Sequence, residues 1–250
     1  MSGNYWSIVK ANISPDAPGG QALEDELNEW WSDHQGEYVE KDGFTYGWRA
    51  RLTAHDHPGV LGTAPHKYHA IYEVDEIAVF NKSLLDGTIS NPGDPWGPWQ
   101  SYVDDYVLDW ERTYYKVLYR HEAKTGQGKF FACIKFDIAL TDDKQESAFD
   151  DWYTNTHVPE ICSYPGIYRA WRLEVAPDDG DLGNRRQRFW GVYEVDSPDN
   201  FAHARQDRTD KGIKPFDGLW LDKVINLEIS FYDILYQIDH DTAKSSRGSE

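Results

Sequence analysis

A long internal repeat is the feature of this sequence that most constrains its fold. The stretch from Trp152 to Glu174 matches the stretch 123 residues earlier without a gap, which aligns His157 with His34 and Arg172 with Arg49. Three further blocks match in the same order at similar offsets. Four ordered matches are not expected by chance, so the chain is predicted to contain one fold unit twice.

Hydrophobic patterning predicts the same order of elements in both copies. Strand, helix, strand, strand, helix and strand follow one another between Tyr5 and Tyr119, and the order recurs between Phe130 and Tyr236. This is the β-α-β-β-α-β arrangement of a ferredoxin-like unit. The predicted division is a first ferredoxin-like repeat at residues 1–120, a second at residues 121–238, and a disordered tail at residues 239–250, which lacks apolar anchors.

Two four-stranded sheets in one chain must each bury an open face. A ferredoxin-like sheet has helices on one face only, so two such sheets laid face to face would enclose a barrel-like core. The predicted fold class is therefore α+β, with tandem ferredoxin-like repeats forming a dimeric α+β barrel within one chain. Such a pseudo-dimer would be a stable monomer, or at most a weak homodimer.

The acidic composition excludes several partner classes. The 250 residues carry a formal net charge of -18, whereas nucleic acids and anionic membranes are bound by clustered Lys and Arg. No segment approaches the roughly 18 to 20 apolar residues of a membrane span, and the N-terminus does not have the pattern of a secretory signal. Cys133 and Cys162 are expected to be reduced thiols. We therefore expect a cytoplasmic protein that binds neither nucleic acid nor membranes.

One run of residues resembles a known family. The motif W-Y-x-x-x-H-x-P-E followed by P-G is similar to that of EthD-domain proteins of the dimeric α/β barrel superfamily, and nearly all of residues 5–236 share the resemblance. The residues of this motif in the present sequence are Trp152, Tyr153, His157, Pro159, Glu160, Pro165 and Gly166. The first copy departs from the motif, with Gln35-Gly36-Glu37 in place of Val158-Pro159-Glu160. The resemblance implies small-molecule chemistry: cyclases, decarboxylases, isomerases, dehydratases and cofactor-free monooxygenases have related barrels, and other barrels of the superfamily hold haem.

His157 and His34 are the first candidates for acid–base catalysis. Both are predicted at the C-terminal end of the first helix of a repeat, where the helix dipole favours the imidazolium and raises its pKa. Glu160 and Glu37 follow three residues later and could orient the ring or share its proton. In the alternative interpretation, each His only caps a helix end by bonding free carbonyls.

Strand alternation supplies charged candidates. It predicts that Lys10 pairs with Glu73, and Lys135 with Glu194, as ion pairs that are either structural or part of a substrate site. Arg49 and Arg172 could clamp a substrate carboxylate or phenolate, or could form outward salt bridges.

Aromatic side chains are unusually abundant, with 11 Trp and 16 Tyr, which suits a cavity lined by rings. Tyr68 and Tyr72 are candidate catalytic phenols that could hold or protonate an enolate, although core tyrosines are the alternative. Candidate substrate-binding residues of the same kind are Trp48, Trp171, Tyr193, Trp190 and His69.

A histidine cluster, formed by His55, His57, His66 and His69, has no counterpart in the second copy. A metal could take several of these imidazoles, but the spacing is not a zinc signature. Nucleotide and flavin fingerprints do not occur either. We therefore expect neither a metal nor a cofactor.

These residues favour a cofactor-independent lyase. The reaction would be of the cyclase, decarboxylase, dehydratase or C–C lyase type, on an aromatic or polyketide-like small molecule, by His/Tyr acid–base chemistry. Two alternatives remain open: a cofactor-free monooxygenase acting on a similar substrate, and a non-enzymatic barrel that binds a hydrophobic ligand or haem.

Overall fold

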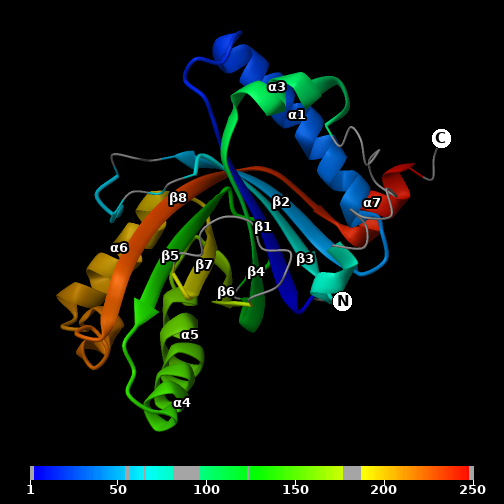
Figure 1. The fold of residues 1–250 in the computed structure, drawn as a ribbon. Coiled ribbons are helices and arrows are strands. Elements are labelled where there is room, and N and C mark those ends of the chain that lie inside the picture. The colour runs from blue at the N-terminus through cyan, green and yellow to red at the C-terminus, as the bar shows by residue number, and fades with distance from the viewer. Residues whose placement is uncertain are drawn as a thin grey trace.

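Antiparallel strands close into a barrel within this one chain (Figure 1). The computed structural model describes residues 3–53, 57–62, 64, 66–80, 96–122, 124–176 and 187–247. Around the barrel, the strands of these ranges follow the order β1-β3-β2-β8-β5-β7-β6-β4. They are β1 (Tyr5–Ile13), β2 (Phe44–Thr53), β3 (Tyr68–Val74), β4 (Val107–Glu122), β5 (Phe130–Ile138), β6 (Ile167–Val175), β7 (Phe189–Val195) and β8 (Val224–Asp239).

Helices cover the barrel on two opposite sides, as Figure 1 shows. On one side lie α1 (Gly20–Val39), α3 (Gln100–Tyr106) after the short turn η1 (Gly97–Trp99), and α7 (His240–Arg247). On the other lie α4 (Asp143–Trp152), η2 (Tyr153–His157), α5 (Val158–Cys162), α6 (Pro198–Asp210) and the turn η3 (Pro215–Gly218). The α+β fold with an antiparallel sheet is thus confirmed.

Local sequence signals explain where the second-half helices begin. The Asp142 carboxylate accepts a hydrogen bond from the backbone N–H of Gln145 at the start of α4. The Ser197 hydroxyl accepts one from Asn200 at the start of α6, where Pro198 needs no hydrogen-bond partner for its nitrogen. Side-chain caps of this kind typically stabilise a helix by about 1 kcal/mol each.

No described helix is long and apolar enough to cross a membrane.

The middle of the barrel is filled by three indole rings. Trp6 lies 5.2 Å from both Trp48 and Trp171, measured between ring centroids, and the latter two lie 5.7 Å apart. All three side chains are buried. The interior at this level is therefore a packed core, and space for a ligand must be sought elsewhere.

Two further apolar layers fill the space between the barrel and its helices. Trp31 and Tyr38 of α1 pack on the first half, and Phe149 and Phe201 of α4 and α6 pack on the second. Burial of each such side chain is worth roughly 1.5–3 kcal/mol. These outer layers are where each half meets its own helices, and the candidate site lies in one of them.

The predicted pairing of Lys10 with Glu73 is wrong, and so is that of Lys135 with Glu194. Lys10 Nζ lies 3.3 Å from Glu111 of β4, and Lys135 Nζ lies 2.7 Å from Glu228 of β8. The antiparallel register sets Lys10 opposite His69, so the two carboxylates of the expected pairs lie towards the other end of the barrel.

The predicted disordered tail is also wrong where the structure describes it. Residues 240–247 form α7, in which Ala243 is only 2% exposed. The imidazole Nδ1 of His240 lies 2.7 Å from the carbonyl oxygen of Val39. The helix docks on the end of α1 through one small apolar residue and polar contacts, which hydrophobicity alone does not reveal. Residues 248–250 lie outside the described ranges.

We expect Lys135→Met to lower the free energy of unfolding by about 3–5 kcal/mol, because the Glu228 carboxylate, only 5% exposed, would stay buried without its cation. The double variant K135M/E228Q should recover most of this loss. Urea unfolding measures both, with K116M at an exposed position of β4 as the matched control. A single variant no less stable than K116M would contradict the role of the pair.

Candidate functional site

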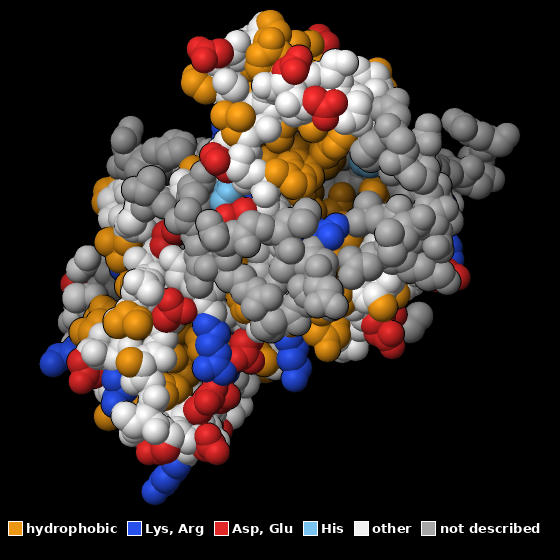
Figure 2. All heavy atoms as spheres, viewed as in Figure 1, with side chains coloured by type: hydrophobic (Ala, Val, Ile, Leu, Met, Phe, Trp, Pro, Cys, Tyr) orange, Lys and Arg blue, Asp and Glu red, His pale blue; other side chains and the backbone are white. Residues whose placement is uncertain are grey.

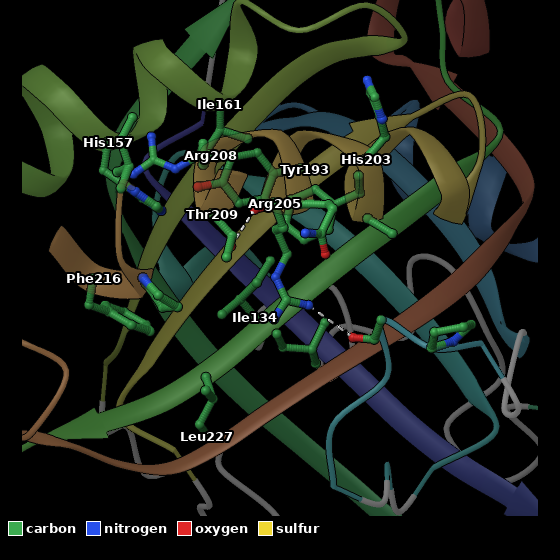
Figure 3. Close-up of a pocket in the computed structure, with 18 of the residues that line it drawn as sticks. Ile134, His157, Ile161, Tyr193, His203, Arg205, Arg208, Thr209, Phe216 and Leu227 are labelled. Carbon is green, nitrogen blue, oxygen red and sulfur yellow. Dashed lines mark hydrogen bonds between the residues drawn. The ribbon is translucent and has the colours of Figure 1, made fainter. Parts of the chain in front are cut away.

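A cavity of about 510 Å³ lies between the second-half sheet and the helices η2, α5 and α6 (Figure 3). Its lining combines apolar side chains with several polar and charged ones, a composition that suits a small-molecule site with specific polar contacts. The apolar wall includes Ile134, Ile161, Phe201, Phe216, Leu227 and Ile229. Pro58 and Gly59 come from the first half, so both halves of the chain contribute to the cavity.

Tyr153 and His157 reach the cavity from an irregular turn of helix. The η2 segment has π-helical geometry, and the N–H of Val158 bonds to the carbonyl oxygen of Tyr153, five residues back. Pro159 follows and has no N–H to continue the regular pattern, which is a physical reason for the widened turn. The first copy has Gly36 at the matching position, and α1 continues there as a regular helix.

His157 is an uncharged group at neutral pH. Its ring stacks on Trp152, with centroids 4.9 Å apart, and lies parallel to the ring of Phe216 at 6.4 Å. Its Nδ1 is buried and has no hydrogen-bond partner among the described residues. Burial, with a smaller contribution from the positive charge of Arg208, lowers the pKa of His157 to about 3.

The prediction that a helix end raises the pKa of His157 is therefore wrong. The helical segment continues through α5, so His157 lies inside it, and desolvation by the aromatic neighbours dominates. Glu160 does not approach the ring as a partner either. Its carboxylate forms an ion pair with Arg208 of α6.

Two phenols lie beside His157 in the cavity. Burial raises the pKa of Tyr153 to about 12 and that of Tyr193 well above its usual value, and each hydroxyl affects the pKa of the other. A Cβ at Gly191 would lie 2.4 Å from the Tyr153 hydroxyl oxygen, so only glycine allows this oxygen to sit over β7. Both groups remain protonated at neutral pH and can donate hydrogen bonds to an oxyanion.

Two arginines line the cavity, and neither was predicted from the sequence as a site residue. Arg205 and Arg208 extend from α6, and Arg205 Nη1 donates a hydrogen bond to the Gly59 carbonyl oxygen at 3.2 Å. The internal match gives no signal for these arginines, because α6 belongs to none of the matched blocks. Helical spacing was the available signal, since Phe201, Ala204 and Arg208 are the buried positions of this helix.

Three predicted site residues face α1 in the first half, and a fourth, His34, belongs to α1 itself. Arg49 stacks on Trp31 at 3.5 Å, and its Nη2 donates to Asn28 Oδ1 at 2.6 Å; burial lowers the pKa of Arg49 to about 9. Tyr68 donates to Glu24, and burial raises the pKa values of both Tyr68 and Tyr72.

His34, the fourth of these residues, is held within an aromatic stack. Its ring lies 4.9 Å from that of Trp30, and Trp96 packs against Trp30 at 5.7 Å. Its Nδ1 lies 3.2 Å from the carboxylate of Glu37. Indole rings therefore pack around His34 in the first half.

Arg172 was predicted either to clamp a substrate or to form an outward salt bridge. In the structure its guanidinium pairs with Asp150 of α4, outside the barrel. The remaining predicted residues lie inside the barrel. Trp48 and Trp171 belong to the central core, and Trp190 lies beneath Lys10 and Lys135.

His69 and Glu73 also point into the barrel. The His69 ring stacks on Tyr232 with centroids 4.2 Å apart, and burial lowers its pKa well below the usual value. Glu73 pairs with Arg120 at 2.6 Å. Of the predicted residues, the structure therefore brings His157 and Tyr193 together at the cavity, with Glu160 behind Arg208.

Among the described members of the histidine cluster, His57 contacts Phe231 and α6, whereas His66 lies close enough to His69 for its charge to lower the pKa of His69. His57 pairs with Asp199 at 3.0 Å, His66 bonds to the Asp109 carbonyl oxygen at 3.0 Å, and His55 lies outside the described residues. Within the described ranges, no three His, Cys, Asp or Glu side chains are grouped as a metal site.

The cavity also gives a poor fit to haem. Iron-bound imidazoles usually bond their second nitrogen to a carboxylate, carbonyl or water. The Nδ1 of His157 has no such bond to a described residue. His203, the other imidazole at the cavity, is an exposed side chain.

Comparison with known proteins identifies the fold. No protein-family model and no curated protein sequence matches this chain. Solved structures match along nearly its whole length. An anthrone oxidase-like protein has a TM-score of 0.60 at 9% identity over 96% of both chains. A "putative monooxygenase" from Lactobacillus acidophilus NCFM has a TM-score of 0.58 at 9% identity, over 96% of this chain and 97% of that one.

A variant chlorite dismutase from Candidatus Nitrospira defluvii matches with a TM-score of 0.50 at 9% identity, over 98% of this chain and 95% of that one. This chain has the dimeric α/β-barrel fold of these proteins. At such identities the likeness concerns the fold, and the reaction must be argued from the cavity.

We expect His157 to make the protein less stable in acid. Its folded pKa of about 3 lies below the ordinary value near 6.5, so the unfolded state takes up the proton first and stability falls as pH drops from about 6.5 towards 3. Between pH 7 and 4.5, wild type should therefore lose about 2 kcal/mol more than His157→Gln. Urea unfolding at both pH values measures this, with H203Q as the control. Parallel curves for wild type and H157Q would contradict the buried, neutral imidazole.

Proposed function

We propose that this chain is an enzyme that removes a proton from an aromatic or polyketide-like small molecule bound in the second-half cavity. The observation that carries this proposal is the uncharged imidazole of His157 in an apolar cavity that also contains two protonated phenols. A neutral imidazole can accept a proton, and so His157 would act as the base.

The first step would move a proton from a carbon beside a carbonyl or phenol to His157. The electron pair left behind would be delocalised onto the carbonyl or phenol oxygen as an enolate. The hydroxyls of Tyr153 and Tyr193, which line the same cavity, would donate hydrogen bonds to such an oxyanion, and the apolar part of the lining would limit the water that weakens these bonds.

A cofactor-independent lyase is the reaction class we favour. In its dehydratase form, the enolate would expel a hydroxyl from the neighbouring carbon: the C–O bond breaks, a C=C bond forms, and the leaving oxygen takes the proton from the His157 imidazolium. Water would leave and the neutral imidazole would be restored. The cycle balances without any oxidant or cofactor.

A cofactor-free monooxygenase is the second candidate, and the names of the anthrone oxidase-like protein and of the Lactobacillus protein favour it. It would start from the same deprotonated substrate. Molecular oxygen would then convert a ring CH₂ group to a carbonyl, with the second oxygen atom leaving as water.

We also propose that the two halves are tandem ferredoxin-like repeats, of which the second carries the working site. Each half contributes four consecutive barrel strands in equivalent order, β4-β1-β3-β2 and β8-β5-β7-β6, which supports the duplication. Indole rings pack around His34, whereas a cavity adjoins His157. The first half would then serve as a partner that closes the barrel.

The charge of the chain supports a small molecule as its partner. On the face in Figure 2, acidic side chains are spread over both helical lobes, and the described Lys and Arg side chains form no continuous patch. With a net charge of -18, we propose a cytoplasmic enzyme without a resident cofactor that binds neither nucleic acid nor membranes.

We expect His157→Gln to lower turnover by about 100-fold or more, the usual scale for a lost general base, while substrate affinity changes little. A screen of aromatic and polyketide-like carbonyl compounds, followed by product analysis, provides the assay, and H203Q is the matched control at the cavity edge. An oxygen electrode separates the two candidates, because only the monooxygenase consumes oxygen in step with product. Full activity of H157Q, or a Soret band in the purified protein, would contradict the proposal.

The pH dependence of kcat/KM gives a separate test. A base with a pKa of about 3 stays deprotonated above pH 5, so kcat/KM for a substrate that does not itself titrate should vary by no more than about twofold between pH 5 and 7. Circular dichroism at each pH checks that the protein stays folded. A half-maximal rate near pH 6.5 would instead indicate an ordinary, solvated imidazole as the base.

A further inference from the structure

Arg205 is a cation in the cavity that has no acidic partner among the described residues. Its Nη1 donates one hydrogen bond to the Gly59 carbonyl oxygen, and no described carboxylate forms an ion pair with it. The guanidinium group has five N–H donors, so most of them are available to a ligand. Burial lowers the pKa of Arg205, and no neighbouring charge offsets that effect.

Arg205 differs in this respect from the other arginine that lines the cavity. The sequence has 43 acidic and 25 basic residues, and Arg208 and two cations near the cavity do have acidic partners. Arg208 pairs with Glu160, Arg172 with Asp150, and Lys211 with Asp207. Asp199, the acid among the cavity residues, is 90% exposed at its side chain and is engaged by His57 at 3.0 Å. A positive charge at the cavity without a partner among the described carboxylates points to a ligand that supplies the negative one.

The surroundings of Arg205 define the rest of such a ligand. Figure 3 shows Arg205 reaching from α6 towards Ile134, while His157 and Arg208 lie on the far side of Tyr193. The apolar wall between them accommodates a hydrophobic body. A ligand that satisfies both ends therefore carries an acidic group at some distance from the carbon that His157 would deprotonate.

We infer that the cavity binds an aromatic or polyketide-like carboxylic acid and that Arg205 binds its carboxylate. The inference rests on the proposed function because it concerns the same cavity, but it is a statement about binding and not about turnover. A guanidinium can hold a carboxylate through two parallel hydrogen bonds, which distinguishes an acid from its neutral amide. Arg205 would thus decide which compounds enter the cavity, and His157 would act on those that do.

The experiment compares two probes that differ only in charge. Binding of 2-naphthoic acid and of naphthalene-2-carboxamide is measured by isothermal titration calorimetry at pH 7.5 and low salt, on the full chain. Wild type should bind the acid at least about tenfold more tightly than the amide, the scale of one charge-assisted hydrogen bond. In Arg205→Met this preference should fall to within about twofold of unity, while the affinity for the amide stays nearly constant. R205Q provides a second, polar variant, and thermal melts check the folding of both.

Lys211→Met is the matched control, because it removes the same charge from the end of the same helix at a side chain that does not line the cavity. It should keep the preference for the acid. The inference is overturned if wild type binds both probes equally or neither, if R205M and R205Q keep the preference, or if K211M loses it equally. H157Q separates this inference from the proposed function: it should keep the acid preference whether or not it loses turnover.

Discussion

Closure of the barrel depends on hydrogen bonds between strands of opposite halves. β4 pairs with β6, and β8 pairs with β2, so the last strand of each half joins the other half. Without these two seams, each half would present an open four-stranded sheet with two unsatisfied edges and an exposed apolar face. The long strands β4 (Val107–Glu122) and β8 (Val224–Asp239) provide the extra length that the seams require. The packing of the indole core and of the buried ion pairs follows from this closure.

Closure also determines where a ligand can bind. Trp6, Trp48 and Trp171 fill the middle of the barrel, and the candidate cavity lies outside it, between a sheet and its helices. The layer between sheet and helices differs between the two halves. In the first half it holds a stack of rings around His34, whereas in the second a widened helical turn, next to Pro159, presents Tyr153 and His157 to a cavity.

The sequence predicts the α+β class and the helices and strands well, because the hydrophobic period and the internal match depend on local information. It fails where distant residues decide. Lys10 faces the barrel as alternation predicts, yet its partner Glu111 is chosen by strand register. The pKa of His157 depends on burial against Phe216, which comes from a different turn of the chain. Arg205 belongs to a helix outside the matched blocks, so comparison of the two copies did not reveal it.

Pro58 and Gly59 of the first half form part of the wall of the second-half cavity, so the cavity depends on both halves. In the duplication that we propose, the two copies would be interchangeable at first, and either could be lost. Once a loop of one copy forms part of the other copy's cavity, neither half retains a complete site alone. Under that proposal the first half could accumulate tryptophans, but it could not be deleted without removing part of the cavity wall. A separated second half would have a cavity open on one side, so asymmetry between the copies becomes a reason for the chain to remain double.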